Sequence, residues 1–243
     1  MVVTDCIWEK DNIGKNTVEI TINKGDNINS INFEKYLKLY EYTVVKVPMC
    51  MVELNVMLGN LGFSLIEVQM NVSSKIKGYD WNRINLDIKD IRFDVLSDSE
   101  DIKKVLNQIT DDMFSTDRIT LDRNFGPKIG HNRYVNWIKN DFENHRSKVA
   151  VVNYRNEEVG FMMYRIKENI FHLLLNGLYK KWQGRHLGII TPASPLIYSL
   201  VKPEITEVKT SISSNNIPVV KLYNRLGYLL DDQNYVFVKH NWS

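Results

Sequence analysis

The chain has 243 residues, of which 44% are apolar and 25% are charged. This composition excludes a disordered, collagen-like or coiled-coil protein and predicts either one large globular domain or two small ones. The 31 basic and 29 acidic residues leave a net charge of +2, so the chain has no overall basic field for nucleic acid.

The first third of the chain alternates between strand and helix patterns, which predicts an α/β unit over residues 1–75. Five elements are expected there in the order strand, helix, strand, helix, strand: 17–22, 31–42, 43–49, 53–63 and 63–72. A polar stretch with few aliphatic residues follows at 71–91 and predicts a linker, which we place at 76–90.

The rest of the chain, 91–243, predicts a second and larger unit with a mixed sheet. Strand patterns occur at 91–97, 147–154, 159–166, 170–178, 208–213 and 235–240. Helix patterns occur at 97–109, 131–144, 189–201 and 215–227, and 111–130 is irregular and rich in charge. The predicted fold class is therefore α/β with a mixed sheet of the α+β kind, and it has two units.

A glycine-containing turn, YKKWQGRHLG at 179–188, joins an apolar strand to a helix. Glycines leave backbone N–H groups free at such a turn, and the helix N-terminus adds the positive end of a dipole, so the turn suits a phosphate or pyrophosphate. A tight turn that binds nothing is the alternative interpretation of such a segment taken alone.

A second stretch, NNIPVVKLYNRLGY at 215–228, predicts an amphipathic helix that ends at Gly227. Taken alone, its Tyr223 is a partly buried aromatic residue with its hydroxyl at the surface.

The two stretches together, in this order and about 30 residues apart, resemble the GNAT superfamily of acetyl-CoA-dependent N-acetyltransferases. The strand before the loop ends in Asn176-Gly177-Leu178, where the family has a splayed strand that pairs with pantetheine. The family's loop motif Q/R-x-x-G-x-G/A corresponds to Gln183, Gly184, Arg185, His186, Leu187 and Gly188. Its C-terminal pattern N-x-x-A-x-x-L-Y-x-x-x-G-F/Y corresponds to Asn216, Val219, Leu222, Tyr223, Gly227 and Tyr228.

Nearly the whole chain resembles one branch of that superfamily, the dTDP-fucosamine acetyltransferases, which carry an extra N-terminal α/β domain. Four groups of residues in the branch's order support this closer resemblance. They are Trp8-Glu9 with 12–16, the run 61–67, Phe114-Ser115 with Asp117-Arg118, and Arg133-Tyr134 with Trp137-Ile138.

The resemblance implies acetyl-CoA as the co-substrate and an amino-sugar nucleotide as the acceptor, specifically a 4-amino-4,6-dideoxyhexose. It assigns Tyr223 as the general acid that protonates the departing thiolate, a role that suits a phenol with a pKa near 10. A backbone N–H near Leu178 would stabilise the developing oxyanion. Asn176, Leu178, the loop 183–188 and Asn216 would bind the co-substrate, although Asn216 is an equally good helix cap.

The general base and the acceptor site are less constrained by sequence. His172 lies six residues before Leu178 on one strand, so an even offset predicts a shared face and a proton-relay role. A strand-end histidine without a role is the alternative. The candidates for the sugar nucleotide are Asp117, Arg118, Arg133 and Tyr134, since arginine suits a diphosphate and tyrosine suits stacking on a base. Surface salt bridges are the alternative for the charged ones.

Three residues depart from the family pattern. His186 stands where the family usually has glycine, and a positive φ would be costly there. Pro192 and Pro195 fall in the helix that follows the loop, where Pro195 is harder to place. These departures leave open a degenerate acyl-CoA-binding module. A GNAT enzyme for another amine, such as an antibiotic, a polyamine or a protein N-terminus, is a further alternative.

Composition excludes several other sites. The two cysteines, Cys6 and Cys50, form no CxxC or Cys/His cluster, so we expect free thiols and no metal site. No apolar run approaches the ~20 residues that span a bilayer, and the N-terminus does not resemble a signal peptide. We therefore expect a cytoplasmic protein with no membrane or nucleic-acid partner, and a homodimer by the resemblance.

Overall fold

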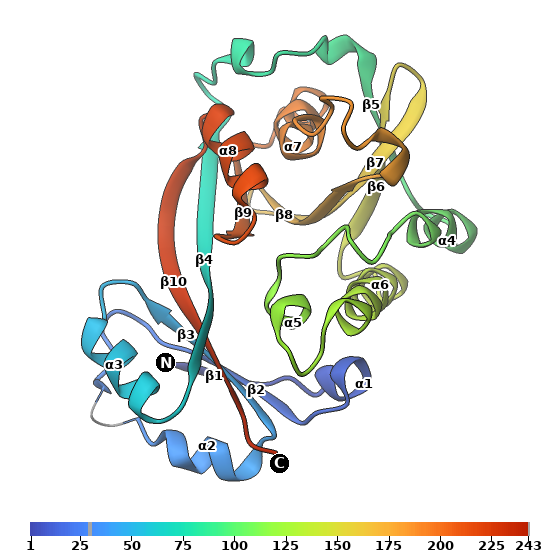
Figure 1. Cartoon of the computed structure of the whole chain (residues 1–243). Coiled ribbons are helices and arrows are strands. Elements are labelled where there is room, and N and C mark those ends of the chain that lie inside the picture. Colours follow the sequence, from blue (N-terminus) through green and yellow to red (C-terminus); the bar gives the residue numbers. More distant parts are fainter. Residues whose placement is uncertain (29–30, 243) are drawn as a thin grey trace.

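The computed structural model describes residues 1–28 and 31–242 and contains one mixed ten-stranded sheet. The strand order is β1-β2-β3-β10-β4-β9-β8-β7-β6-β5. The β2–β3 and β8–β9 pairs are parallel, and the other neighbouring strands in this order are antiparallel. Helices α6 and α7 lie on opposite sides of β7 and β8 (Figure 1). A mixed α/β fold, as the sequence predicts, is confirmed.

The first part of the chain forms β1 to β4 with three helices. Their bounds are β1 (Val2–Asp5), α1 (Glu9–Ile13), β2 (Thr17–Thr21), α2 (Phe33–Leu39), β3 (Tyr42–Pro48), α3 (Val52–Asn60) and β4 (Ser64–Lys75). Two short 3₁₀ turns, Trp81–Arg83 and Ile88–Asp90, follow β4.

The remaining elements alternate around the other half of the sheet. Their bounds are β5 (Ile91–Val95), α4 (Ser99–Asn107), α5 (Arg118–Leu121), α6 (Pro127–Glu143), β6 (Lys148–Tyr154), β7 (Glu157–Lys167), β8 (Ile170–Leu178), α7 (Ile190–Val201), β9 (Glu207–Ser213), α8 (Ile217–Arg225) and β10 (Leu229–His240). A 3₁₀ turn at Lys180–Trp182 lies between β8 and α7.

Several boundaries differ from the sequence prediction. The strand β4 continues to Lys75, so 71–75 is sheet and not linker. The stretch 111–130, expected to be irregular, contains α5, and α6 already begins at Pro127, where proline suits a first helical position. The sequence also gave no prediction for β1 and α1. Both are short, and short elements carry too few residues to show a periodicity.

The sheet runs without a break across the expected boundary between the two units. The last strand, β10, pairs with β3 and β4, two strands from the first third of the chain. On its other edge β4 pairs with β9. The division into 1–75, 76–90 and 91–243 therefore remains a prediction about sequence segments that share one sheet.

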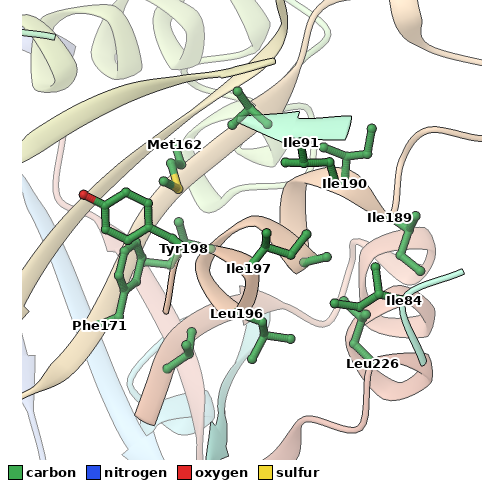
Figure 2. Close-up of a cluster of buried hydrophobic side chains, with 14 of the residues drawn as sticks. Ile84, Ile91, Met162, Phe171, Ile189, Ile190, Leu196, Ile197, Tyr198 and Leu226 are labelled. Carbon is green, nitrogen blue, oxygen red and sulfur yellow. The ribbon is translucent and has the colours of Figure 1, made fainter. Parts of the chain in front are cut away.

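The largest hydrophobic cluster surrounds α7, whose residues from Ile190 to Ser199 are all buried. Figure 2 shows Tyr198 of this helix beside Phe171 and Met162, and Leu226, which directly follows α8, beside Ile84. Ile84, from the expected linker, is only 4% exposed and packs in the same cluster, which fixes this segment against the core. No helix within the described ranges is long and apolar enough to cross a bilayer.

Candidate functional site

A gap opens in the sheet between β8 and β9. These two parallel strands pair over four positions, from Ile170 with Glu207 to Leu173 with Thr210. Thr210 Oγ1 donates to the Leu173 carbonyl at 2.9 Å where the pairing ends. Beyond this point the β8 ladder continues with β7 alone. The β8 edge that faces the gap therefore carries backbone groups without a strand partner, which an extended ligand can pair with.

A β-bulge at Leu174 decides which side chains of β8 face which side of the sheet. The register against β7 shifts there by one residue, and a shift of one residue exchanges the two faces of a strand. Leu173 and Leu178 consequently pack in the α7 cluster, whereas Leu175 packs in the cluster beneath α4 and α6. The expectation that His172 and Leu178 share a face is therefore wrong, because the even-offset argument holds only for a regular strand.

Tyr223 lies on α8 at the point where the two strands diverge. It is only 3% exposed, and its hydroxyl faces the side chains of Asn176 on β8 and Thr210 on β9. Burial raises the pKa of Tyr223 above its ordinary range, although the two polar neighbours lower it in part. Asn176 Nδ2 is buried and, among the described residues, has no hydrogen-bond partner. A buried donor without an acceptor is costly, so a ligand carbonyl placed there would stabilise the site.

Asn216 caps the helix that presents Tyr223. Its side chain accepts a hydrogen bond from Val219 N at 3.3 Å, and Pro218 lies in the first turn of α8. The helix ends before Gly227, which adopts a φ of 76°. Of the two roles that the sequence allowed for Asn216, helix capping is confirmed, and contact with the co-substrate stays a prediction.

The loop 183–188 is mostly exposed and is held to β8 by Gln183 Nε2, which donates to the Leu178 carbonyl at 3.2 Å. Gly184 has a φ of 73° and His186 a φ of 61°, so the expected strain at His186 is present. In the described part of the chain, the backbone N–H groups of Gly184, Arg185 and Gly188 donate no backbone hydrogen bond. These groups are available to an anion at the start of α7.

Cationic side chains flank this loop. The Arg185 guanidinium lies 5.3 Å from the centre of the Trp182 ring, and Lys181 Nζ lies 4.8 Å from it. Lys180 and Lys181 also pair with the exposed Asp112 and Glu157. Because the two lysines are paired with carboxylates, Arg185 is the side chain here that adds positive charge to a backbone that already suits a diphosphate.

The two prolines of α7 are accommodated without ending the helix. Pro192 is the third residue of α7, where its missing N–H costs little. Pro195 lies inside the helix, which nevertheless runs from Ile190 to Val201. The expected difficulty at Pro195 does not break α7, because the surrounding core packs around the whole helix.

A cavity of about 770 Å³ lies next to the gap, on the side of the sheet that carries α6. Its lining is mainly polar and comes from β4, β8, β9 and β10, with Trp137 contributed by α6. His172 also lines it, and its pKa is lowered by burial and by Lys209 and Lys167. The lining residues that carry chemistry are Gln69, Asn71, Trp137, His172, Lys209, Ser211, Asp231 and Asp232.

The four residues expected to bind a sugar nucleotide lie near one another, but they are engaged by the protein. Asp117 caps α5 by accepting from Ile119 N at 2.8 Å. Arg133 forms a bidentate pair with the buried Glu9, at 2.6–2.9 Å. Arg118 lies 3.7 Å from Glu9 and 3.4 Å from Glu19. These ion pairs are largely buried around Glu9 and are not the surface salt bridges that the sequence left open.

Tyr134, the fourth of these residues, packs against two aromatic neighbours. Its ring centre lies 4.4 Å from that of Phe114 and 6.2 Å from that of Trp137. Burial raises the pKa of its hydroxyl, and Asp117 adds to the effect. Tyr134 therefore lies in a buried aromatic cluster beside the cavity-lining Trp137.

Sequence reasoning gave no role to two carboxylates, Glu9 and Glu67, that the structure brings to this region. Both fall inside stretches that support the resemblance, yet neither had a neighbour in sequence that indicated a role. Glu9 is only 1% exposed and neutralises Arg133. Glu67 lies on β4 close to Asp117 and Arg118 of α5. Among the described residues, no group of three or more His, Cys, Asp or Glu side chains is placed to hold a metal ion.

No family model matches the sequence, and no curated protein matches it either. Solved structures do match. A functionally unknown conserved protein from Staphylococcus epidermidis is 16% identical, with a TM-score of 0.61 over 93% of this chain and 85% of that one. A tandem GNAT protein from the clavulanic acid biosynthesis pathway is 11% identical, with a TM-score of 0.58 over 93% of this chain and 76% of that one.

A GCN5-related N-acetyltransferase from Kribbella flavida is 10% identical, with a TM-score of 0.56 over 92% of this chain and 80% of that one. At these identities the likeness concerns the fold. The chain has a GNAT fold, as its sequence motifs predict.

Proposed function

We propose that the protein is an acetyl-CoA-dependent N-acetyltransferase. The observation that carries this proposal is the gap between β8 and β9, which combines an unpaired strand edge, the orphaned donor of Asn176 and the hydroxyl of Tyr223. The exposed loop 183–188 follows β8 directly and offers backbone N–H groups for a diphosphate. Together these four features support the binding of an extended thioester with a diphosphate at one end.

Acetyl-CoA would supply an acetyl group activated as a thioester. In this proposal β8 and Asn176 orient the ligand, the loop 183–188 with His186 binds its diphosphate, and Tyr223 protonates the departing sulfur. The raised pKa of Tyr223 keeps its hydroxyl protonated at neutral pH, as a general acid requires. A backbone N–H near Leu178 would stabilise the negative charge that develops on the carbonyl oxygen.

The acceptor that we propose is a nucleotide-linked amino-deoxy sugar, specifically a 4-amino-4,6-dideoxyhexose. The cavity next to the gap supports this choice, since it combines an aromatic ring from Trp137 with amide, hydroxyl and carboxylate groups that suit sugar hydroxyls. Asp117, Arg118, Arg133 and Tyr134 remain the proposed nucleotide-binding residues. The two arginines would have to exchange Glu9 and Glu19 for the diphosphate of the sugar nucleotide.

Release of free thiol from acetyl-CoA, measured with a panel of amines, tests the proposal. We expect turnover with a dTDP- or UDP-linked amino-deoxy sugar and none with spermidine, kanamycin or a peptide N-terminus. Turnover with one of those three amines alone would support acetyl transfer and refute the amino-sugar nucleotide as the acceptor. Acetyl-CoA binding by calorimetry without turnover on any amine would indicate a degenerate acyl-CoA-binding module. Cytoplasmic location and a homodimer belong to the same proposal.

A further inference from the structure

The register of the sheet places Glu67 at the open end of the gap. Strand β4 runs antiparallel to β9, and their last paired residues are Gln69 and Ser213. Glu67 is two residues beyond Gln69 and therefore shares its face, the same face from which Gln69 and Asn71 line the cavity. Because β9 has ended at Ser213, Glu67 lies where β8 has already diverged from the sheet.

The groups around Glu67 come from four elements and leave it without an ion pair. Burial raises the pKa of this carboxyl, and Asp117 adds to the rise, while Ser213, Arg118 and Lys46 lower it in part. The guanidinium of Arg118, which lowers the pKa of Glu67, is paired with Glu9 and Glu19, and none of the ion pairs in the described chain includes Glu67. The titratable and charged groups that face it are Lys46 of β3, Asp117 and Arg118 of α5, and Tyr134 of α6.

Resting on the function proposed above, the geometry points to Glu67 as the group that takes the proton from the acceptor amine. The step balances without a further reactant. The Glu67 carboxylate accepts one proton from the bound ammonium, and the neutral nitrogen attacks the thioester carbonyl. The C–S bond then breaks, and the thiolate takes the Tyr223 proton. The attacking nitrogen loses its second proton, which restores the Tyr223 hydroxyl by way of solvent, and Glu67 releases its own proton to water.

His172, the candidate base named from the sequence, is less well placed for this step. It lies in the part of β8 that still pairs with β9, directly opposite Lys209. Its side chain lines the cavity where β8 and β9 are still paired, before the bulge at Leu174. Glu67 and the splayed residues of β8 instead lie at the same open end of the gap, where the strand register places them on either side of it.

The test compares Glu67→Gln with Glu67→Asp and with a control, Glu143→Gln, at the exposed end of α6. Acetyl-CoA affinity by calorimetry and thiol release with the preferred amino-sugar nucleotide are measured for each from pH 5 to pH 9. We expect Glu67→Gln to lose about 10²–10⁴-fold in kcat, with acetyl-CoA affinity unchanged. Glu67→Asp should recover part of this loss, and the control should match the wild type.

The pH profile separates a proton-accepting role from a structural one. In the wild type, kcat/KM should fall on the acid side with a midpoint above the ordinary glutamate value of about 4.3, and Glu67→Gln should abolish this limb. If Glu67→Gln does not fold, the test is whether Glu67→Asp shifts the acid limb of the kcat/KM pH profile. If the wild type is active and both substituted enzymes keep its rate and its acid limb, the assignment of Glu67 as the base is wrong and the proposed function stands. If the wild type is inactive on every amine, the proposed function is wrong as well.

Discussion

Replacing Tyr223 by phenylalanine removes one buried hydroxyl and leaves the ring in place. The neighbours of that hydroxyl, Asn176 and Thr210, are both neutral, so its loss strands no charge. The free energy of unfolding should change by no more than ~1.5 kcal/mol, the worth of one hydrogen bond between neutral groups. The loss of a general acid, by contrast, should lower kcat about 10²–10⁴-fold, which corresponds to ~3–5 kcal/mol in the activation barrier.

The assay is thiol release from acetyl-CoA under saturating acceptor, together with acetyl-CoA affinity by calorimetry. A fall in kcat with near-normal affinity would show that the hydroxyl stabilises the transition state and does not contribute to the binding of acetyl-CoA. Because burial raises the pKa of Tyr223, the hydroxyl stays protonated beyond pH 10. The activity of the wild type should therefore show no basic limb from Tyr223 below about pH 10.

Tyr228→Phe is the matched control. This tyrosine is also buried, its ring lies 4.8 Å from that of Tyr223, and its hydroxyl donates to the Pro192 carbonyl at 3.2 Å. It does not face the gap, and the family pattern accepts phenylalanine at this position. We expect its kcat to equal that of the wild type. A Tyr223→Phe enzyme that turns over as fast as the control would refute the assignment of Tyr223 as the acid.

Three further substitutions test the geometry around the site. His186→Gly removes the strain of a positive φ, so acetyl-CoA affinity should be kept or improved and unfolding stability should rise by about 1 kcal/mol; lost affinity would show a specific contact by the imidazole. Glu9→Gln leaves Arg133 buried with a neutral partner and should cost about 3–5 kcal/mol in urea unfolding, and a loss below 1 kcal/mol would show that the network is solvated. Gly160→Ala would place a Cβ 2.3 Å from the Gly177 carbonyl oxygen, so we expect the free energy of unfolding to fall by about 1–3 kcal/mol and kcat to fall as well. A variant with the melting temperature of the wild type would contradict the close approach of β7 and β8.

The local chemistry of the site could be read from the sequence because it depends on neighbouring residues. The loop 183–188 and the helix that carries Tyr223 were both expected where the structure has them. Asn216 caps that helix through a bond to Val219, three residues away. Glycine, asparagine and proline act within one turn of chain, so their effects follow from spacing alone.

The roles expected for the charged residues were harder to predict, because charge by itself does not name a partner. Arg133 looked suited to a diphosphate, yet it meets Glu9 from the other end of the chain, 124 residues away. His172 and Leu178 looked as if they shared a face until the bulge at Leu174 exchanged the faces between them. A bulge is one extra residue in a ladder, and nothing in an apolar run such as 170–178 marks where it falls.

The sequence by itself determined the secondary structure of most of the chain, the fold class, the anion-suited loop and the tyrosine that we propose as the acid. The tertiary structure alone decided that β4 lies between β9 and β10, and this pairing brings Glu67 to the open end of the gap. Local spacing fixes a helix or a turn, but the neighbour and register of a strand depend on packing between residues far apart in sequence. The length and composition allow one large domain or two small ones, and the structure shows strands from two sequence segments in a single sheet.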